Sequence, residues 1–123
     1  MHLHVLYRSH GGENDAQDRP AYFDERLSLV SFLRAAASVP DIDLTFVNNG
    51  PVPADRLELM QASGDRILQI AAPSDRASLR YAFSYAMGSD WADEDVVYVV
   101  DDDYLHVPEA LERLDRAMRA LAR

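Results

Sequence analysis

Three consecutive aspartates, Asp101, Asp102 and Asp103, carry the strongest chemical signal in this sequence of 123 residues. Adjacent carboxylates repel one another unless a cation binds them or raised pKa values neutralise them. Because side chains alternate in direction along a strand, Asp101 and Asp103 can face one side and Asp102 the other. Two hard oxygen ligands at this spacing suit Mg²⁺ or Mn²⁺, which proteins often hold with one or two carboxylates plus substrate phosphates. The triplet therefore predicts a metal site, with a solvated acidic turn as the alternative.

The aspartates follow a short run of β-branched and aromatic residues, Val96 to Val100. Such a run is typical of a strand that is buried on both faces of a parallel sheet. In open α/β sheets, ligands bind at the carboxyl ends of the strands, which is where this run places the triplet. Pro108 is a favoured first residue for the following helix, so Asp103 comes too early in the chain to be its N-cap.

The rest of the chain alternates between strand-like and helix-like patterns, with glycine or proline at most junctions. We expect a single domain with a Rossmann-like α/β fold, in which an open parallel sheet of order 3-2-1-4 has helices on both faces in three layers. Ser74 should cap the start of the third helix, and Gly64 the end of the second. The strands are expected at residues 2–7, 42–47, 66–70 and 96–100, and the helices at about 22–38, 53–63, 75–87 and 108–122.

Polar residues follow each expected strand and should meet at one edge of the sheet. Arginines beside three carboxylates favour a multiply charged ligand that a metal ion bridges to the protein, and a diphosphate meets this requirement. The residues concerned are Arg8 and Ser9, Asn48 and Asn49, the segment 73–76, and the aspartate triplet.

Composition narrows the class of protein. The formal net charge is −9 and every one of the twelve basic residues is arginine, so the chain lacks the basic face that nucleic-acid binding requires. There is no cysteine for disulfides or thiolate metal sites, and no apolar run of membrane-spanning length. We expect a soluble, cytoplasmic protein with no nucleic-acid partner and no membrane span.

A strand ending in Asp-Asp-Asp after three β-α units resembles the nucleotide-binding half of GT-A fold glycosyltransferases, which carry a DxD motif at this point. The likeness is closest to a bacterial family-2-like group and extends over essentially the whole chain. It covers only the front half of such an enzyme, and the missing half supplies the acceptor site and the catalytic base of inverting members. The similar segments are Leu6-Tyr7-Arg8, Arg19-Pro20 with Phe23, Ser31-Phe32-Leu33, residues 46–51 and residues 102–106.

The resemblance implies a role for particular residues. Asp101 and Asp103 would be the DxD acids that hold Mn²⁺ or Mg²⁺, with Asp101 also serving the ribose, and the ligand would be a nucleotide-diphosphate sugar. The remaining side chains would line the pocket for this ligand: Arg8 with Asn48 or Asn49 around the base and ribose, and Ser78 and Arg80 near the sugar nucleotide. His106 could reach the metal, although local packing is the competing interpretation.

Other functions stay open at this point. A non-catalytic binding or interaction module with a vestigial pocket would show the same pattern. A Toprim-like Mg²⁺-dependent domain also ends a strand in DxD and would use an earlier glutamate such as Glu13, but the acidic charge disfavours its DNA substrate. A receiver domain needs a lysine, which this chain lacks. Because half a sheet leaves apolar surface uncovered, we also expect self-association.

Overall fold

The fold is taken from a computed structural model of the chain, which describes residues 1–10 and 24–121. The segments 11–23 and 122–123 lie outside the described residues. They include Glu13, Arg19, Pro20, the start of the first expected helix at Tyr22, and Phe23, so the predictions made for these positions stay predictions.

Within the described residues the chain alternates between strands and helices, and the strands pair in parallel. They pair in the order β3-β2-β1-β4, which confirms the predicted Rossmann-like α/β fold and its strand order. The elements are β1 (Leu3–His10), α1 (Glu25–Ala36), β2 (Ile42–Asn49), α2 (Ala54–Ser63), β3 (Arg66–Ile70), α3 (Asp75–Met87), β4 (Val96–Asp101) and α4 (Ala110–Leu121).

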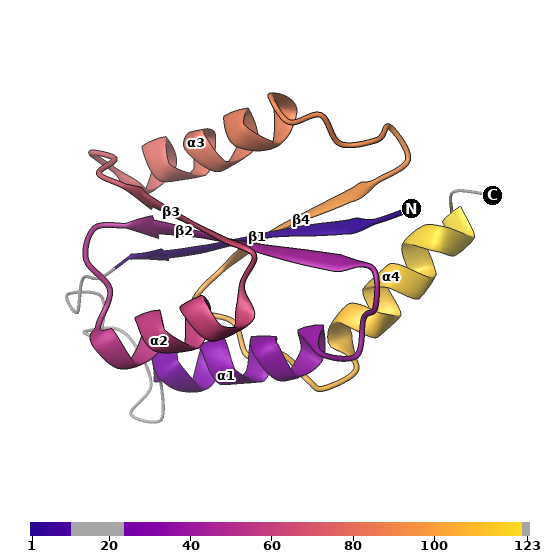
Figure 1. Cartoon of the computed structure of the whole chain (residues 1–123), viewed down its shortest axis with the longest axis horizontal. Helices are drawn as coiled ribbons and strands as arrows, with labels where there is room; N and C mark the ends of the chain where they lie inside the picture. The colour runs from indigo at the N-terminus through magenta and orange to yellow at the C-terminus, as the bar shows by residue number, and fades with distance from the viewer. Residues whose placement is uncertain (11–23, 122–123) are drawn as a thin grey trace.

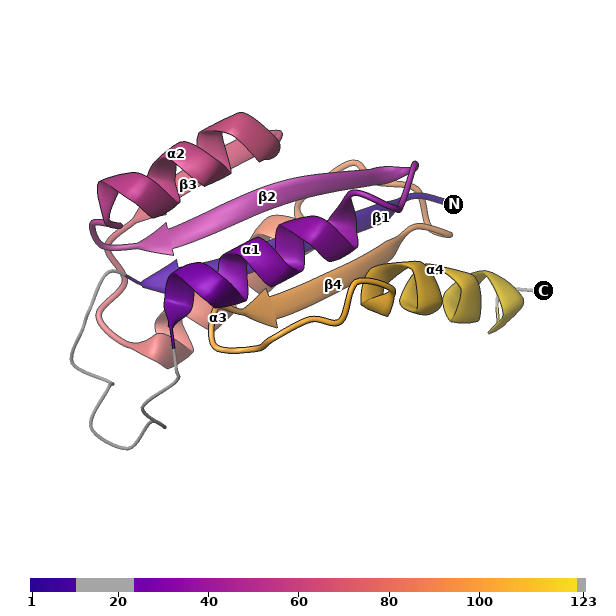
Figure 2. The same ribbon diagram turned by 90° about the horizontal axis from the view of Figure 1, so that it is seen from below.

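Helices cover both faces of the sheet, but unequally (Figures 1 and 2). α1, α2 and α4 lie on one face and α3 lies alone on the other. Crossovers between parallel strands are right-handed, so the direction in which the chain moves across the sheet decides the face that each helix covers. The chain moves outward from β1 to β3 and then returns past β1 to β4, which places α3 on the opposite face from α1 and α2.

The main core lies between the sheet and the face covered by α1. Tyr7, Phe32 and Phe46 meet there, with ring centroids 4.7 Å apart for Tyr7 and Phe32 and 5.6 Å apart for Tyr7 and Phe46. All three side chains are fully buried. Each contributes roughly 1.5–3 kcal/mol through burial of apolar surface, which holds the carboxyl end of β1 rigidly against α1.

Sequence signals at the helix ends behave largely as predicted. The Ser74 side chain accepts a hydrogen bond from the backbone N–H of Ala77, which is the expected N-cap of α3. Gly64 ends α2, but with a φ of −93°, so no left-handed conformation requires glycine there. The requirement is steric, because a Cβ atom on Gly64 would lie 2.4 Å from Cε2 of Phe46. α4 begins at Ala110, two residues later than the expected start at Pro108.

One prediction about β4 is wrong. The strand is not buried on both faces, and of Val96 to Val100 only Val100 is fully buried. It lies at the edge of the sheet, where the predicted order 3-2-1-4 places it, and it pairs only with β1 among the described strands. Val97 is 40% exposed, whereas Val100 is buried against the core. The apolar run reflects β propensity and one covered face, because the lone helix α3 packs over β1 and does not cover the outer part of β4.

None of the helices within residues 24–121 combines the length and the apolar character that crossing a membrane requires.

Candidate functional site

A pocket of about 470 Å³ opens at the carboxyl ends of β1 and β4. These two strands flank the point where the chain reverses its direction across the sheet, which is where open α/β folds bind their ligands. The loop before α3 and the first turn of α3 complete the walls. The lining residues are Arg8, Ser9, His10, Asn49, Ala72, Pro73, Ser74, Asp75, Ser78, Asp101, Asp102 and Asp103.

Arg8 places a buried positive charge in the wall of this pocket. Its guanidinium is buried, with the residue only 6% exposed, and donates to Oδ1 of Asp101 from Nε at 2.9 Å and from Nη2 at 2.6 Å. Nη1 donates to the backbone carbonyl and to Oδ1 of Asp75, at 3.2 Å and 3.3 Å. Both contacts with Asp101 use the same oxygen, so Arg8 leaves Oδ2 of Asp101 unoccupied.

The three aspartates point in different directions, as strand alternation predicts for the first two. Asp101 lies on the α3 face beside Arg8, while Asp102 is only 7% exposed and lies close to Tyr7 and Glu25 on the α1 side. Asp103 comes after the end of β4, so a turn, and not strand alternation, brings this exposed side chain to the pocket. All three aspartates therefore line the pocket, but Asp102 is the buried member and Asp103 the exposed one.

Burial changes the acidity of Asp102. Loss of solvent raises its pKa to about 6, and the nearby Glu25 carboxylate adds to the effect, while His10 opposes it. The backbone N–H of His10 donates to Oδ2 of Asp102 over a long 3.4 Å. Burial likewise raises the pKa of Tyr7, with Asp102 as the second cause. Repulsion within the triplet is therefore relieved in part by protonation of its middle member.

The first turn of α3 supplies hydrogen-bond donors to the pocket. Ser74, Asp75 and Ser78 line it, and Ser78 is almost fully buried. Residues three and four apart on a helix share a face, which explains why Ser78 faces the same side as Ser74. Arg80 lies two residues further on, is exposed, and does not line the pocket. Of the two α3 residues singled out from the sequence, only Ser78 is brought to the site.

The two asparagines at the end of β2 are also separated by strand alternation. Asn49 lines the pocket, and its Oδ1 accepts from the backbone N–H of Ala72 at 2.8 Å, which fixes the loop before α3. Asn48 is fully buried on the other face, where its Oδ1 accepts from the Ser9 hydroxyl at 2.6 Å and its Nδ2 lies 3.5 Å from the Met60 sulfur. Asn49, and not Asn48, is the residue available to a ligand.

His106 lies away from the pocket. Its ring packs edge-on against Phe32 with centroids 5.4 Å apart, its Nε2 is 3.2 Å from the Tyr98 hydroxyl, and burial lowers its pKa. The backbone N–H of His106 donates to the Ser31 hydroxyl at 3.0 Å. These contacts support the interpretation of local packing over that of a metal ligand.

His10 and Asp75 also line the pocket, although neither was predicted individually as a site residue. β1 continues three residues beyond its expected end at Tyr7, and alternation along the longer strand places His10 on the same face as Arg8. The signal available in the sequence was the alternation itself, because Leu6, Arg8 and His10 share one face. Asp75 reaches the site as the first residue of α3.

The pocket is strongly acidic. Among the residues that the structure describes, four aspartates line it, at positions 75, 101, 102 and 103, and Arg8 is the only arginine that does so; two of these aspartates already contact it. An anionic ligand would be repelled here unless a cation entered with it. Carboxylate oxygens from Asp101 and Asp103 are the donors that Mg²⁺ and Mn²⁺ prefer, so the residues fit a hard divalent ion.

Comparison with known proteins does not assign the chain. No protein-family model matches it, and no curated protein shows significant sequence similarity to it.

Proposed function

We propose that this domain binds a nucleotide-diphosphate sugar through Mn²⁺ or Mg²⁺ held by Asp101 and Asp103, in the manner of the nucleotide-binding half of a GT-A fold glycosyltransferase. The supporting observation is the composition of the pocket at the reversal point of the sheet. Carboxylates from the end of β4 face backbone and hydroxyl donors from the first turn of α3 across one hollow of about 470 Å³.

Charge explains why the metal is needed. Two like unit charges about 4 Å apart repel by roughly 4 kcal/mol where the effective dielectric constant is near 20. A diphosphate would meet such repulsion here, because the single positive charge of Arg8 lies between Asp101 and Asp75 and offsets only one of these two carboxylates. A divalent ion between the carboxylates and the phosphates turns this repulsion into attraction, so binding should depend strictly on the metal.

Each wall of the pocket has a role in this proposal. Asp103 and Oδ2 of Asp101 hold the ion, and Arg8 fixes the orientation of the Asp101 carboxylate. Ser74 and Ser78 in the first turn of α3 bind phosphate oxygens, since a helix N-terminus favours anions.

Asn49 and the loop at Ala72 and Pro73 form the wall on the β2 side, where the nucleoside would lie. Any selectivity for one base over another would arise at this wall, which is the reason to test several nucleotides.

Transfer of the sugar is a further step in the same proposal. The ion would supply Lewis-acid stabilisation to the departing diphosphate. The bond between the anomeric carbon and the phosphate oxygen would break as the acceptor oxygen bonds to that carbon, and the acceptor's proton would pass to solvent. The chain's own contribution is to orient the diphosphate between β4 and α3. A domain that binds the ligand but transfers nothing is the alternative function, and the two are separated by assaying sugar transfer and hydrolysis after binding is established.

The test is a calorimetric titration of a panel of uridine, guanosine, adenosine and thymidine diphosphate sugars, first with Mn²⁺ and then with a chelator. We expect one nucleotide class to bind with the metal and none to bind in the chelator. Equal binding under both conditions would rule out the metal-bridged site. The absence of binding from every member of the panel would rule out the proposed ligand class.

A further inference from the structure

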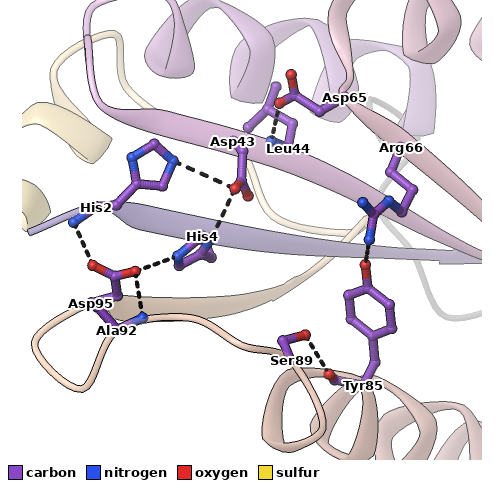
Figure 3. Close-up of polar contacts among 10 residues, drawn as sticks. All are labelled: His2, His4, Asp43, Leu44, Asp65, Arg66, Tyr85, Ser89, Ala92 and Asp95. Carbon is purple, nitrogen blue, oxygen red and sulfur yellow. Dashed lines mark hydrogen bonds and ion pairs between the residues drawn. The ribbon is translucent and has the colours of Figure 1, made fainter.

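Two histidines and an aspartate lie together at the amino-terminal ends of β1 and β2, which is the end of the sheet opposite the acidic pocket (Figure 3). One ligand atom each from His2, His4 and Asp43 can be chosen such that all three lie within 4.8 Å of one another. We propose that these side chains form a second cation site, distinct from the acidic pocket, that takes a borderline transition-metal ion such as Zn²⁺.

The sheet itself brings the three side chains together. His4 in β1 lies directly opposite Asp43 in β2, and its Nδ1 is 2.8 Å from Oδ2 of Asp43. His2 lies two residues before His4, on the same face of the chain, and its Nε2 is 3.4 Å from the same oxygen. Ligand atoms around a tetrahedral ion with bonds near 2.0–2.1 Å lie about 3.3 Å apart, so small side-chain shifts would seat the ion.

His4 is held in place before any metal binds. Its side chain is only 5% exposed, and its ring stacks on Trp91 with centroids 3.9 Å apart and an interplanar angle of 10°. The second ring nitrogen, Nε2, lies 2.8 Å from Oδ2 of Asp95, and Asp95 in turn accepts from the backbone N–H groups of His2 at 3.0 Å and Ala92 at 3.2 Å. A histidine whose far nitrogen is bonded to an anchored carboxylate is the usual arrangement around protein-bound zinc.

The carboxylate of Asp43 provides independent support for a bound cation. Its Oδ2 contacts both histidines, but its Oδ1 is buried and has no hydrogen-bond partner within the described part of the chain. A buried carboxylate oxygen without a partner is costly. A cation at Oδ2 would reduce the charge on the carboxylate and so lower this cost.

If the cluster of His2, His4 and Asp43 has only a structural role, His2 is not needed for it. Without a metal, the His4 ring lies between the carboxylates of Asp43 and Asp95, at 2.8 Å from each, and the 38%-exposed His2 side chain at 3.4 Å from Asp43 would be dispensable. In the proposed site His2 is a ligand. The two sites should also differ in metal preference, because imidazole ligands favour Zn²⁺ and Co²⁺ while the carboxylates of the acidic pocket favour Mg²⁺ and Mn²⁺.

The test is a Co²⁺ titration of the tag-free chain, followed by visible absorption, with Zn²⁺ added afterwards as a competitor. We expect one Co²⁺ per chain with the spectrum of nitrogen and oxygen ligands, and its loss when Zn²⁺ is added. His2→Ala should weaken binding more than tenfold, and Asp95→Asn should weaken it roughly 10- to 100-fold through its effect on His4.

Asp103→Asn is the matched control, because it removes a carboxylate from the acidic pocket and leaves the cluster intact. It should give the same visible Co²⁺ spectrum, with nitrogen and oxygen ligands, as the wild type. Because His2 is partly exposed and precedes the start of β1, His2→Ala should fold normally, which circular dichroism checks. The proposal is overturned if Co²⁺ does not bind, if the His2→Ala protein binds it as tightly as the wild type, or if Asp103→Asn abolishes the spectrum.

Discussion

Replacing Asp102 by asparagine is expected to stabilise the protein by an amount that depends on pH. The Asp102 carboxyl is buried, and its pKa rises from the ordinary 3.8 to about 6, first because burial disfavours the charged form and second because Glu25 is close. Asparagine has nearly the same size and can still accept the hydrogen bond from the His10 backbone. It differs from the carboxylate chiefly in carrying no charge.

The sign follows from proton binding. Between pH 3.8 and pH 6 the folded protein holds a proton on Asp102 that the unfolded chain has released, so stability falls as the pH rises through this window. The stabilising effect of the protonated side chain is complete below the unfolded pKa and is lost above the folded one. A shift of about two units corresponds to a loss of roughly 3 kcal/mol at pH 8, of which about half has occurred by pH 5. The advantage of Asp102→Asn should therefore grow by about 1.5 kcal/mol from pH 5 to pH 8.

The assay is urea unfolding of both proteins at several pH values between 5 and 8, with a chelator present so that no metal contributes. The difference between the two free energies of unfolding should rise with pH and become constant above pH 7. A difference that is the same at every pH, or an asparagine variant that is less stable at pH 8, would refute the reasoning. Either result would mean that the Asp102 carboxylate is better solvated or paired than its burial implies.

Two further predictions concern packing and assembly. Gly64→Ala should lower the free energy of unfolding by about 1–3 kcal/mol in urea denaturation, because the new Cβ would overlap the ring of Phe46. The control is Gly88→Ala, whose new Cβ has its nearest contact at 3.3 Å and which should change this free energy by less than about 1 kcal/mol. Equal effects of the two substitutions would show that the ring of Phe46 moves aside. Phe83 on α3 and Val97 on the edge strand β4 are both exposed, so the chain should self-associate in sedimentation velocity at high concentration and Val97→Lys should reduce this, while a strictly monomeric wild type would contradict it.

The fold could be predicted from the sequence because its signals are local and agree with one another. Alternating strand and helix patterns fix a parallel sheet, and Ser74 marks the start of α3 as expected. The predicted strand order 3-2-1-4 is the order that the structure shows. The predicted order already placed β4 at the edge of the sheet, but the exposure of this strand was missed, since an apolar run looks the same whether one face or both faces of the strand are buried.

The candidate site could be predicted only in part. The pocket is lined by four of the predicted site residues, Arg8, Asn49, Asp101 and Asp103. They could be predicted because the carboxyl ends of parallel strands lie side by side at one end of the sheet. The choice between Asn48 and Asn49 depends on the register of β2 against β1, which propensities do not determine.

The cluster of His2, His4 and Asp43 was missed for the same reason. Residues in different strands become neighbours only through the pairing of those strands, and nothing in the spacing of His2 and His4 points to position 43.

The most direct test of the proposed function compares Asp103→Asn with Asp102→Asn in a calorimetric titration of the nucleotide sugar that binds best, in the presence of Mn²⁺. Both variants remove one charge from the same triplet, but only Asp103 is proposed to hold the ion. Loss of about 4 kcal/mol of attraction should weaken binding by more than 100-fold in Asp103→Asn, and Asp102→Asn should bind nearly as the wild type does. Equal losses in the two variants, or an unaffected Asp103→Asn, would contradict the metal-bridged site.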